Sequence, residues 1–374
     1  MFASCLGAIT GTDNRLGFRS SNSVIAVLVD GLGTANLKFG AGHAPFLNRE
    51  LATSGSIHAG FPSTTASSIT SFATGLPVGQ HGIVGYKVLD PSTNQPVNQL
   101  TGWSSKVDPL RWQPYETIAE RAVAQGVPAF VIGPSDYEKS GFTTLTMRGA
   151  HYLPAKTLHD RVKTAIDVVS SHQHSLVYLY VPELDQAAHA YGVNSHEWLV
   201  QLENLDGEIA LLTKSLVSKR LEKVGLALTA DHGVIDVAKS NQIFLDELLL
   251  PGLKLVAGDP RVNYLYLQDS TEDSVAQATE SIEEQLSNSV VGRSVRLATK
   301  QQLVDAGWFG ARVSDVAAAR MPDIFAIAVG KVALYHREFA PTKSLEMVGQ
   351  HGSISAEELS IPMLRLAALA PSRL

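Results

Sequence analysis

The sequence predicts an α/β protein: a mostly parallel, open β-sheet with helices on both faces, plus a small inserted α/β lid subdomain. Three observations indicate this class. Apolar segments of strand length recur along the 374 residues, amphipathic segments of helical length lie between them, and the sequence character changes between about 238 and 345. Strands that alternate with helices favour a parallel sheet with right-handed crossovers.

The predicted core strands are four segments that are apolar or β-branched almost throughout, as strands covered on both faces are. They are 24–30 (VIAVLVD), 127–133 (VPAFVIG), 175–181 (SLVYLYV) and 224–231 (VGLALTAD). A helix is predicted over 116–126, where Gly126 is suited to cap its C-terminus. Another helix is predicted to begin near Asn194 and Ser195.

The segment 238–345 is the predicted inserted subdomain. Strands are expected at 261–268 (RVNYLYLQ) and 323–329 (DIFAIAV), on either side of a helix over 271–286. That helix carries apolar residues at helical spacing, namely Val275, Ala278, Ile282 and Leu286. The rest of the chain, 1–237 and 346–374, is the predicted core.

The composition argues against several classes of protein. The formal net charge is −6, so we expect no basic surface for nucleic acid or anionic lipid. The single cysteine, Cys5, excludes an internal disulfide. The first ten residues lack a basic signal region, and no apolar run reaches the roughly 18 residues of a membrane helix. We therefore expect a cytoplasmic protein that does not bind a membrane.

Acidic residues and histidines gather where predicted strands end. Six side chains are candidates for metal ligands: Asp30, Asp185, His189, Asp231, His232 and His351. A single aspartate at a strand end is commonly a helix N-cap. Ligands of open α/β sheets, however, bind at the carboxyl ends of strands, where several of these residues should meet. Oxygen and nitrogen ligands without sulfur suit zinc, with manganese as the second choice, and six suffice for two ions.

The stretch FPSTTASSITSFATG (61–75) is rich in hydroxyls, with Ser or Thr at eight of fifteen positions. The segment PSTT predicts the N-terminus of a short helix. A hydroxyl at that N-terminus would face the metals and act as a nucleophile, while the helix N–H groups would point at a phosphoryl oxygen. Capping explains one hydroxyl, and we attribute the others to their position near the metals.

Together these motifs resemble the type I phosphodiesterase/nucleotide pyrophosphatase family of the alkaline phosphatase superfamily. The family's segments stand here, in family order between residues 24 and 365, as VDGLG, FPSTT, ATGLPVGQHGI, VPELDQAAH, TADHGV and GQHGS. The resemblance implies an alkaline-phosphatase-like catalytic core over 1–237 and 346–374. It also implies a hydrolase of phosphodiester or phosphoanhydride bonds, acting on a small-molecule phosphodiester or nucleotide.

Roles follow from the resemblance position by position. The nucleophile falls on Thr65, with Thr64 next in line if the turn differs by one residue. The ligands of the metal that also holds Thr65 would be Asp30, Asp231 and His232. The ligands of the other metal, which would bind the attacking water, are Asp185, His189 and His351. The resemblance implies two zinc ions and a phosphorylated or nucleotidylated threonine intermediate.

Two departures from the family pattern affect the substrate. The family's Pro-Asn-His stands here as Ser67-Ser68-Ile69, and its phosphate-binding asparagine aligns with Tyr86. A phosphomonoesterase or phosphonate hydrolase on the same site is therefore an alternative, as is a metal-binding relative without turnover.

Positive charge near the nucleophile is sparse. Between Phe61 and Asp90 the one cation is Lys87, which on a strand would face away from Tyr86, so that both are not expected to reach the site. Arg111 or Arg148 could supply a cation from a loop. Without such a cation, diesters should be preferred over the more highly charged monoesters.

Overall fold

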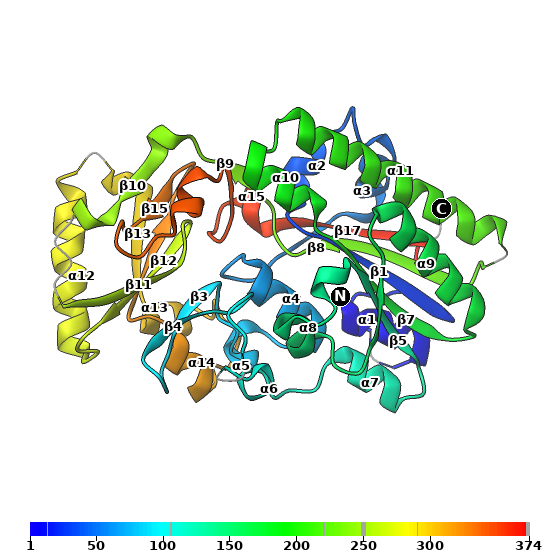
Figure 1. Cartoon of the computed structure of the whole chain (residues 1–374), viewed down its shortest axis with the longest axis horizontal. Helices are drawn as coiled ribbons and strands as arrows, with labels where there is room; N and C mark the ends of the chain where they lie inside the picture. The colour runs from blue at the N-terminus through cyan, green and yellow to red at the C-terminus, as the bar shows by residue number, and fades with distance from the viewer. Residues whose placement is uncertain (13, 105–106, 220, 248–251, 290, 372–374) are drawn as a thin grey trace.

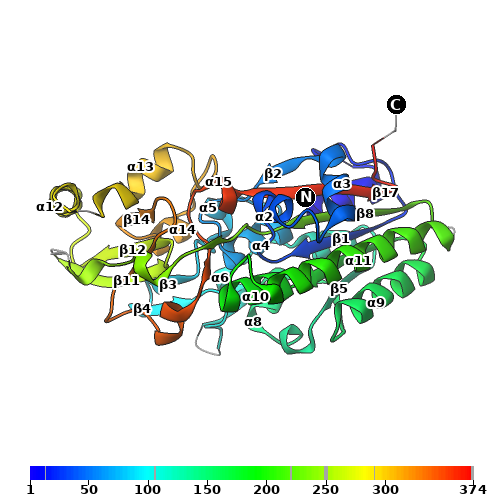
Figure 2. The ribbon, with the colours of Figure 1, turned by 90° about the horizontal axis from the view of Figure 1, so that it is seen from above.

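The structure is a computed structural model that describes residues 1–371 except 13, 105–106, 220, 248–251 and 290. It contains two main sheets at opposite ends of its long axis, as Figure 1 and the perpendicular view in Figure 2 both show. The larger sheet lies to the right in Figure 1, and the smaller sheet lies to the left, beside α12 (Glu272–Ser287).

The larger sheet has seven strands in the order β2-β17-β8-β1-β7-β5-β6. Neighbours from β8 to β6 run parallel, and β17 pairs antiparallel with both β8 and β2. The bounds are β1 (Ser23–Val29), β2 (Ser56–His58), β5 (Ala129–Gly133), β6 (His151–Pro154), β7 (Ser175–Val181), β8 (Val224–Ala230) and β17 (Ser360–Ala367). The predicted mostly parallel sheet and its four core strands are confirmed, with only their ends shifted.

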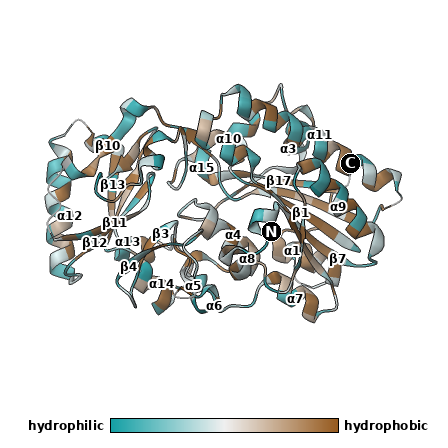
Figure 3. Cartoon of the chain, in the orientation of Figure 1, coloured by the Kyte–Doolittle hydropathy of each residue, from teal (hydrophilic) through white to brown (hydrophobic). Residues whose placement is uncertain are grey.

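Strand β1 shows why these segments are apolar throughout: every one of its residues is buried. Side chains alternate between the two faces of a strand, so that Ile25 and Val27 join one apolar cluster while Val24 and Ala26 join another. The first cluster is covered by α3 (Pro45–Ser54), α9 (Leu158–Ser171), α10 (Glu183–Tyr191) and α11 (His196–Ser218). The second is covered by α1 (Phe2–Thr10), α4 (Thr65–Thr74) and α7 (Ile118–Ala124). Figure 3 shows hydrophobic residues along the strands between these two layers.

Both predicted core helices form, with local signals at their ends. Thr117 and Glu120 build a reciprocal capping box at the start of α7, and Gly126 adopts a φ of 76° beyond its end. Ser195 caps α11 by accepting a hydrogen bond from the backbone N–H of Trp198. These ends are therefore decided by residues adjacent in the sequence.

The smaller sheet has four strands in the order β11-β12-β14-β13, and every pair is antiparallel. The bounds are β11 (Leu253–Asp259), β12 (Val262–Leu267), β13 (Val295–Thr299) and β14 (Ile324–Ala328). Helix α12 packs on it through Ala278, Ile282 and Leu286. The strands expected at 261–268 and 323–329 correspond to β12 and β14, which pair antiparallel with each other.

An apolar cluster joins the predicted insert to segments that precede and follow the candidate nucleophile. Phe61, Val88 and Val97 share this cluster with Tyr264 and Phe325 of the smaller sheet. Val88 and Val97 belong to the hairpin of β3 (Lys87–Asp90) and β4 (Gln95–Asn98). The division of the chain at residues 238 and 345 stays a prediction, and the two parts are firmly packed together.

Short elements complete the fold. They are α2 (Thr34–Phe39), α5 (Val78–His81), α6 (Pro109–Trp112), α8 (Gly141–Thr146), β9 (Ile235–Asp236), β10 (Gln242–Phe244), α13 (Lys300–Asp305), α14 (Asp315–Arg320), β15 (Ala333–Tyr335), β16 (Gly349–Gln350) and α15 (Ala356–Leu359). Strand β16 pairs with β9, and β15 with β10. In the described part of the chain, no helix combines the length and apolar character needed to span a membrane.

Candidate metal centre and active site

The candidate ligands meet because three neighbouring strands end at one level. Val29 at the end of β1 pairs with Val181 of β7 and with Ala230 of β8. The next residue after β1 is Asp30, and the next after β8 is Asp231. Asp185 lies in the first turn of α10, directly after β7. The carboxyl ends of the parallel strands therefore carry three buried aspartates to one edge of the sheet.

Glycine allows this close approach. Gly31, which follows Asp30, has a φ of 71°, and a Cβ there would lie 2.9 Å from the Cβ of Asp185. A side chain at this position would clash with the candidate ligand and would strain the backbone. The Asp-Gly sequence after β1 thus has a structural reason of its own.

The first ligand group consists of Asp30, Asp231 and His232, whose ligand atoms all lie within 4.8 Å of one another. The Nε2 atom of His232 is 3.4 Å from Asp30 Oδ1 and 3.5 Å from Asp231 Oδ2. It is also 3.2 Å from the hydroxyl oxygen of Thr65. The structure therefore brings the candidate nucleophile beside the three residues expected to share its metal.

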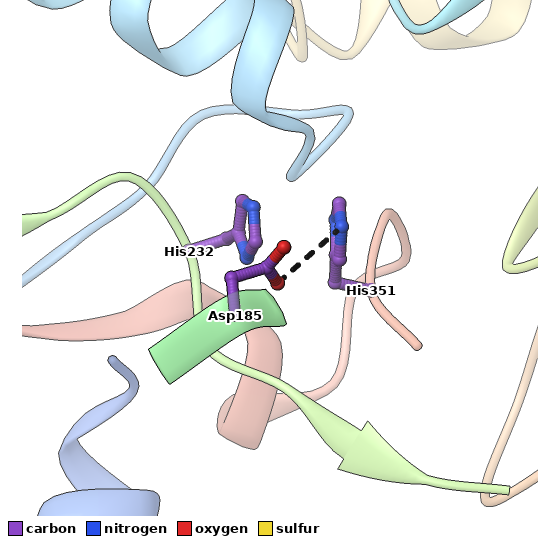
Figure 4. A group of neighbouring side chains, drawn as sticks. All are labelled: Asp185, His232 and His351. Carbon is purple, nitrogen blue, oxygen red and sulfur yellow. Dashed lines mark ion pairs between the residues drawn. The ribbon is translucent and has the colours of Figure 1, made fainter. Parts of the chain in front are cut away.

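The second group contains Asp185, His189 and His351. Nε2 of His189 lies 3.1 Å from Asp185 Oδ2, and Nε2 of His351 lies 4.0 Å from Asp185 Oδ1. The ligand atoms of Asp185, His351 and His232 also lie within 4.8 Å of one another. Figure 4 shows these three side chains side by side. His232 stacks on His351 with ring centroids 3.6 Å apart. His232 therefore adjoins both groups.

Backbone carbonyls orient each imidazole. Nδ1 of His189 donates to Gly349 O at 2.8 Å, and Nδ1 of His351 donates to Ser63 O at 3.0 Å. Nδ1 of His232 is 3.2 Å from Gly233 O. Because a carbonyl can only accept, each Nδ1 carries a hydrogen and each Nε2 is turned toward the carboxylates, the orientation that metal-ligating histidines adopt.

Burial controls the electrostatics of the first group. It raises the pKa of Asp30 well above its usual value, and the nearby charges of Asp231 and Asp185 raise it further. Burial also raises the pKa of Asp231. It lowers the pKa of His232 and that of His351 to about 4, so both imidazoles are neutral at pH 7. For Asp185 and His189 burial is outweighed by their mutual attraction, which lowers the pKa of the acid and raises that of the histidine.

Three carboxylate oxygens here are buried without a hydrogen-bond partner: Asp30 Oδ1, Asp185 Oδ1 and Asp231 Oδ2. Unpaired buried charge is costly unless an opposite charge compensates for it. Divalent cations would provide that compensation, and a set of carboxylates and imidazoles without sulfur suits zinc or manganese. The residues present therefore fit divalent cations.

Most hydroxyls of segment 61–75 have local partners. Thr64 Oγ1 lies 2.8 Å from Ser67 Oγ, which also donates to Pro62 O, and Thr70 donates to Ala66 O. Ser63 Oγ donates to Ser353 O at 2.8 Å. The expectation that nearness to the metals explains these hydroxyls was therefore wrong, because hydrogen bonds within the helix and to a neighbouring loop account for them. Thr65, the first residue of α4, is the hydroxyl that reaches the ligand group.

The ligand groups open into a cleft of about 1020 Å³. Tyr86 and Lys87 both line it, and the expectation that they do not both reach the phosphoryl-binding site stays a prediction. Both line the cleft for a local reason: Tyr86 lies in a bend before β3 begins at Lys87, so the alternation of a regular strand does not apply. Neither Arg111 nor Arg148 lines this cleft, and Arg148 is paired with Glu120 at 3.2 Å.

Two cleft residues were missed by sequence reasoning. The hydroxyl of Tyr180 donates to Asp30 Oδ2 from the neighbouring strand β7. Asp259, at the end of β11, lines the cleft with its Oδ2 buried and unpartnered, and burial raises its pKa to about 8. An aspartate before a Pro-Arg turn has the sequence signature of an ordinary hairpin, so no local signal distinguishes Asp259.

Comparison with known proteins agrees with this arrangement. The model of the type I phosphodiesterase/nucleotide pyrophosphatase family matches residues 24–354. The chain is 28% identical over 193 residues to an uncharacterized pyrophosphatase/phosphodiesterase of Schizosaccharomyces pombe, covering 50% of this chain and 39% of that protein. It is 26% identical over 204 residues to human ectonucleotide pyrophosphatase/phosphodiesterase family member 1, covering 53% and 22%. The chain thus spans well under half the length of these relatives.

The fold has counterparts among solved structures. Murine ectonucleotide pyrophosphatase/phosphodiesterase 5 superposes with a TM-score of 0.69 at 20% identity, covering 92% of this chain and 87% of that one. An inactive threonine-to-alanine variant of the murine protein in complex with AMP gives a TM-score of 0.68 at 19% identity, with the same coverage. At this identity the likeness establishes the fold alone. With the family model matching most of its length, the chain belongs to the type I phosphodiesterase/nucleotide pyrophosphatase family.

Proposed function

We propose that this protein hydrolyses phosphodiester or phosphoanhydride bonds, with Thr65 as nucleophile and two zinc ions as cofactors. The observation that carries the proposal is the placement of the Thr65 hydroxyl 3.2 Å from His232, which adjoins both ligand groups. Membership of a family of phosphodiesterases and nucleotide pyrophosphatases supports the reaction class.

The ligand sets are those implied by the motifs. Asp30, Asp231, His232 and the hydroxyl of Thr65 would hold one ion, and the three side chains Asp185, His189 and His351 would hold the other. Bound zinc, or manganese in its place, would act as a Lewis acid toward the phosphoryl oxygens and lower the pKa of a coordinated hydroxyl or water. The chain's own contribution is to fix the imidazoles through their Nδ1–carbonyl hydrogen bonds.

The chemical steps follow from the position of Thr65. Its hydroxyl gives its proton to solvent and its oxygen forms a bond to phosphorus. The bond to the leaving group breaks in line with the attack, and the leaving group departs with the electron pair. The product is a phosphoryl or nucleotidyl ester of Thr65, which water then hydrolyses to restore the hydroxyl. Thr65 stands at the first position of α4, where the free backbone N–H groups of the helix start would bind an anionic phosphoryl oxygen.

We infer that the substrate is a small phosphodiester or a nucleotide. The cleft is lined by aromatic side chains, including Tyr86, Trp103 and Phe339, which suit a planar or apolar leaving group. The similar murine protein has been solved with AMP. A net charge of −6 argues against a nucleic-acid substrate. A cytoplasmic location remains our prediction.

A phosphomonoesterase or phosphonate hydrolase is the second candidate, and Lys87 is the observation that favours it. Its side chain is half-buried and lines the cleft, and within the described residues it forms no ion pair. An ammonium group in this position could bind the additional negative charge of a monoester. A relative that binds metal without turnover is a third possibility, which any measured hydrolysis would exclude.

One assay separates these candidates. Nitrophenyl mono- and diesters of phosphate, and a phosphonate ester, are compared with zinc, with manganese and with a chelator. We expect metal-dependent hydrolysis with a higher kcat/KM for the diester. A monoester preference of tenfold or more, about 1.4 kcal/mol of transition-state discrimination, would favour the phosphatase alternative. Full activity in metal-free protein would contradict the proposal.

A further inference from the structure

The carboxylate of Glu358 lies behind the candidate metal centre and joins parts of the chain that are distant in sequence. Glu358 belongs to α15 and is fully buried, as is its partner Arg261. Arg261 donates from Nε to Glu358 Oε1 at 3.1 Å and from Nη2 to Oε2 at 2.8 Å. Oε1 also accepts from the backbone N–H of Ser353 at 3.0 Å. This carboxylate is therefore held by three hydrogen bonds.

The Ser353 hydrogen bond ties Glu358 to the loop that carries His351. Ser353 is two residues after His351, and its hydroxyl donates to Ala328 O of β14. The same loop also bonds to the nucleophile segment, since Gly352 N donates to Ser63 Oγ and His351 Nδ1 donates to Ser63 O. The loop thus reaches the helix start of Thr65 on one side and Glu358 on the other.

The backbone of the Glu358 segment contacts the other histidine loop. Gly233, directly after His232, donates its N–H to Glu358 O at 2.8 Å. A Cβ on Gly233 would lie only 2.0 Å from Glu357 O, so only glycine permits this contact. The side-chain carboxylate of Glu358 therefore bonds to the His351 loop, and its backbone carbonyl bonds to the His232 loop. The imidazoles of these two loops stack with ring centroids 3.6 Å apart.

Arg261 connects Glu358 to the predicted insert. It lies in the turn between β11 and β12, and its Nη1 donates to Val332 O. The residues just before it, Gly258 to Pro260, line the cleft. Asp259 approaches the His351 loop closely, because a Cβ on Gly352 would lie 3.3 Å from Asp259 Cβ. The ion pair therefore fixes one wall of the cleft as well as the ligand loops.

Stability alone is a poor explanation for such a pair. Removing two charges from water is expensive, and replacing a buried ion pair by apolar residues of similar volume is often neutral or stabilising. A bidentate guanidinium–carboxylate pair instead offers a defined geometry. The Arg261–Glu358 pair contacts the loop that carries His351 and the hairpin that forms one wall of the cleft. The geometry that the pair defines is therefore that of the candidate site.

We propose that Glu358 is a positioning residue: through Ser353 and Arg261 it holds the His351 loop and the β11–β12 hairpin against the His232 loop, and so sets the spacing of the two ligand groups. This inference rests on the proposed function insofar as the groups hold metal ions. It concerns the chain's own residues, and it can be tested by measuring metal affinity, without an activity assay.

The test is the variant R261M/E358L in the full-length protein, titrated with Co²⁺ in place of zinc. Co²⁺ reports both affinity and, through its visible absorption, coordination geometry. We expect the Tm of this variant to lie within about 3 °C of the parent value. The affinity of the more weakly bound of the two Co²⁺ ions should be at least about tenfold lower than in the parent, and the visible spectrum should change. The kcat should fall while KM changes little.

The matched control is R148M/E120Q, which removes another Arg–Glu pair. That pair lies at 3.2 Å, and the other hydrogen bonds of Arg148 go to backbone carbonyls of residues 113, 115 and 145. The control should keep both Co²⁺ affinities and the spectrum. If R261M/E358L also keeps its affinities within twofold and an unaltered spectrum, the pair is merely structural and the proposal fails.

A second variant covers a failure to fold. E358Q keeps the shape of the side chain and one acceptor oxygen but removes the charge, and the same Co²⁺ measurements apply. Unchanged affinities and spectrum in E358Q would overturn the proposal. Failure of the proposed function is visible separately, as a parent protein that binds fewer than two Co²⁺ ions or hydrolyses none of the phosphate or phosphonate esters.

Discussion

The carboxyl edge of the larger sheet and the hairpin of the smaller one face the same cleft but are built differently. At the sheet edge, β1 and β8 are followed directly by the buried Asp30 and Asp231, and the first turn of α10 after β7 adds the buried Asp185, with Gly31 allowing close approach. At the hairpin, β11 turns into β12 and offers one unpartnered carboxylate oxygen, on Asp259. The first region can hold metal ions, whereas the second can only contact what is bound there. We therefore expect the sheet edge to control whether reaction occurs and the hairpin to control which substrate reacts.

The largest effect is expected for the nucleophile. Thr65→Ala should reduce kcat by about 10³-fold or more, because no other hydroxyl of α4 reaches the ligand group in the described structure. Metal content, measured by elemental analysis, should stay near the parent value. Thr64→Ala is the control and should cost less than tenfold, since Thr64 bonds to Ser67. A reversed order would shift the nucleophile by one residue.

Next come two aspartates, one from each region. Asp231→Asn should lose bound metal and reduce kcat/KM by about 10²-fold, because it removes a charge from the ligand group. Asp259→Asn should keep the metal content and change kcat/KM by tenfold or less, with a different factor for each leaving group. Elemental analysis and assays on two diesters test both. Equal loss of metal in the two variants would remove the distinction between the regions.

Asp259 also predicts a pH dependence of stability. Burial raises its pKa from 3.8 to about 8, so between these values the folded protein keeps a proton that the unfolded chain has released. The parent should therefore lose stability as pH rises from about 4 to 8, with no further loss from this group above pH 8. Asp259→Asn has no carboxyl group to ionise and should not show this loss. The Tm of the variant minus that of the parent, measured in the presence of a chelator, should therefore increase as the pH rises from about 4 to 8. A constant difference would show that Asp259 is ionised throughout.

The smallest effect is expected for Lys87, which lines the cleft that both regions face. Lys87→Met should raise KM by about threefold to tenfold for a phosphoanhydride or a monoester, and leave a singly charged diester nearly unchanged. The reason is that Lys87 lines the cleft, and the one hydrogen bond that its ammonium group makes to the described residues is long, at 3.5 Å to Phe339 O. Equal effects on all three substrates would exclude a role in charge recognition.

Local sequence determined much of the fold and the candidate ligands. The all-apolar strands, the caps Thr117 and Ser195, and the aspartates after β1 and β8 could be recognised because each depends on neighbours in the chain. The register of parallel strands then brings those aspartates together without further information. The hydroxyls of Thr70 and Thr74 did not need the metals to explain them, because each donates to a backbone carbonyl one helical turn earlier.

Only the tertiary structure decided how the pieces meet. That His232 adjoins both ligand groups depends on His351, which lies 119 residues later in the chain. Asp259 becomes a cleft residue, and Arg261 finds Glu358, because the insert folds back onto the core. Tyr86 and Lys87 share the cleft because of a bend that no periodicity predicts. Such contacts join residues far apart in sequence, so their free energy depends on the packing of the whole fold and leaves no local pattern.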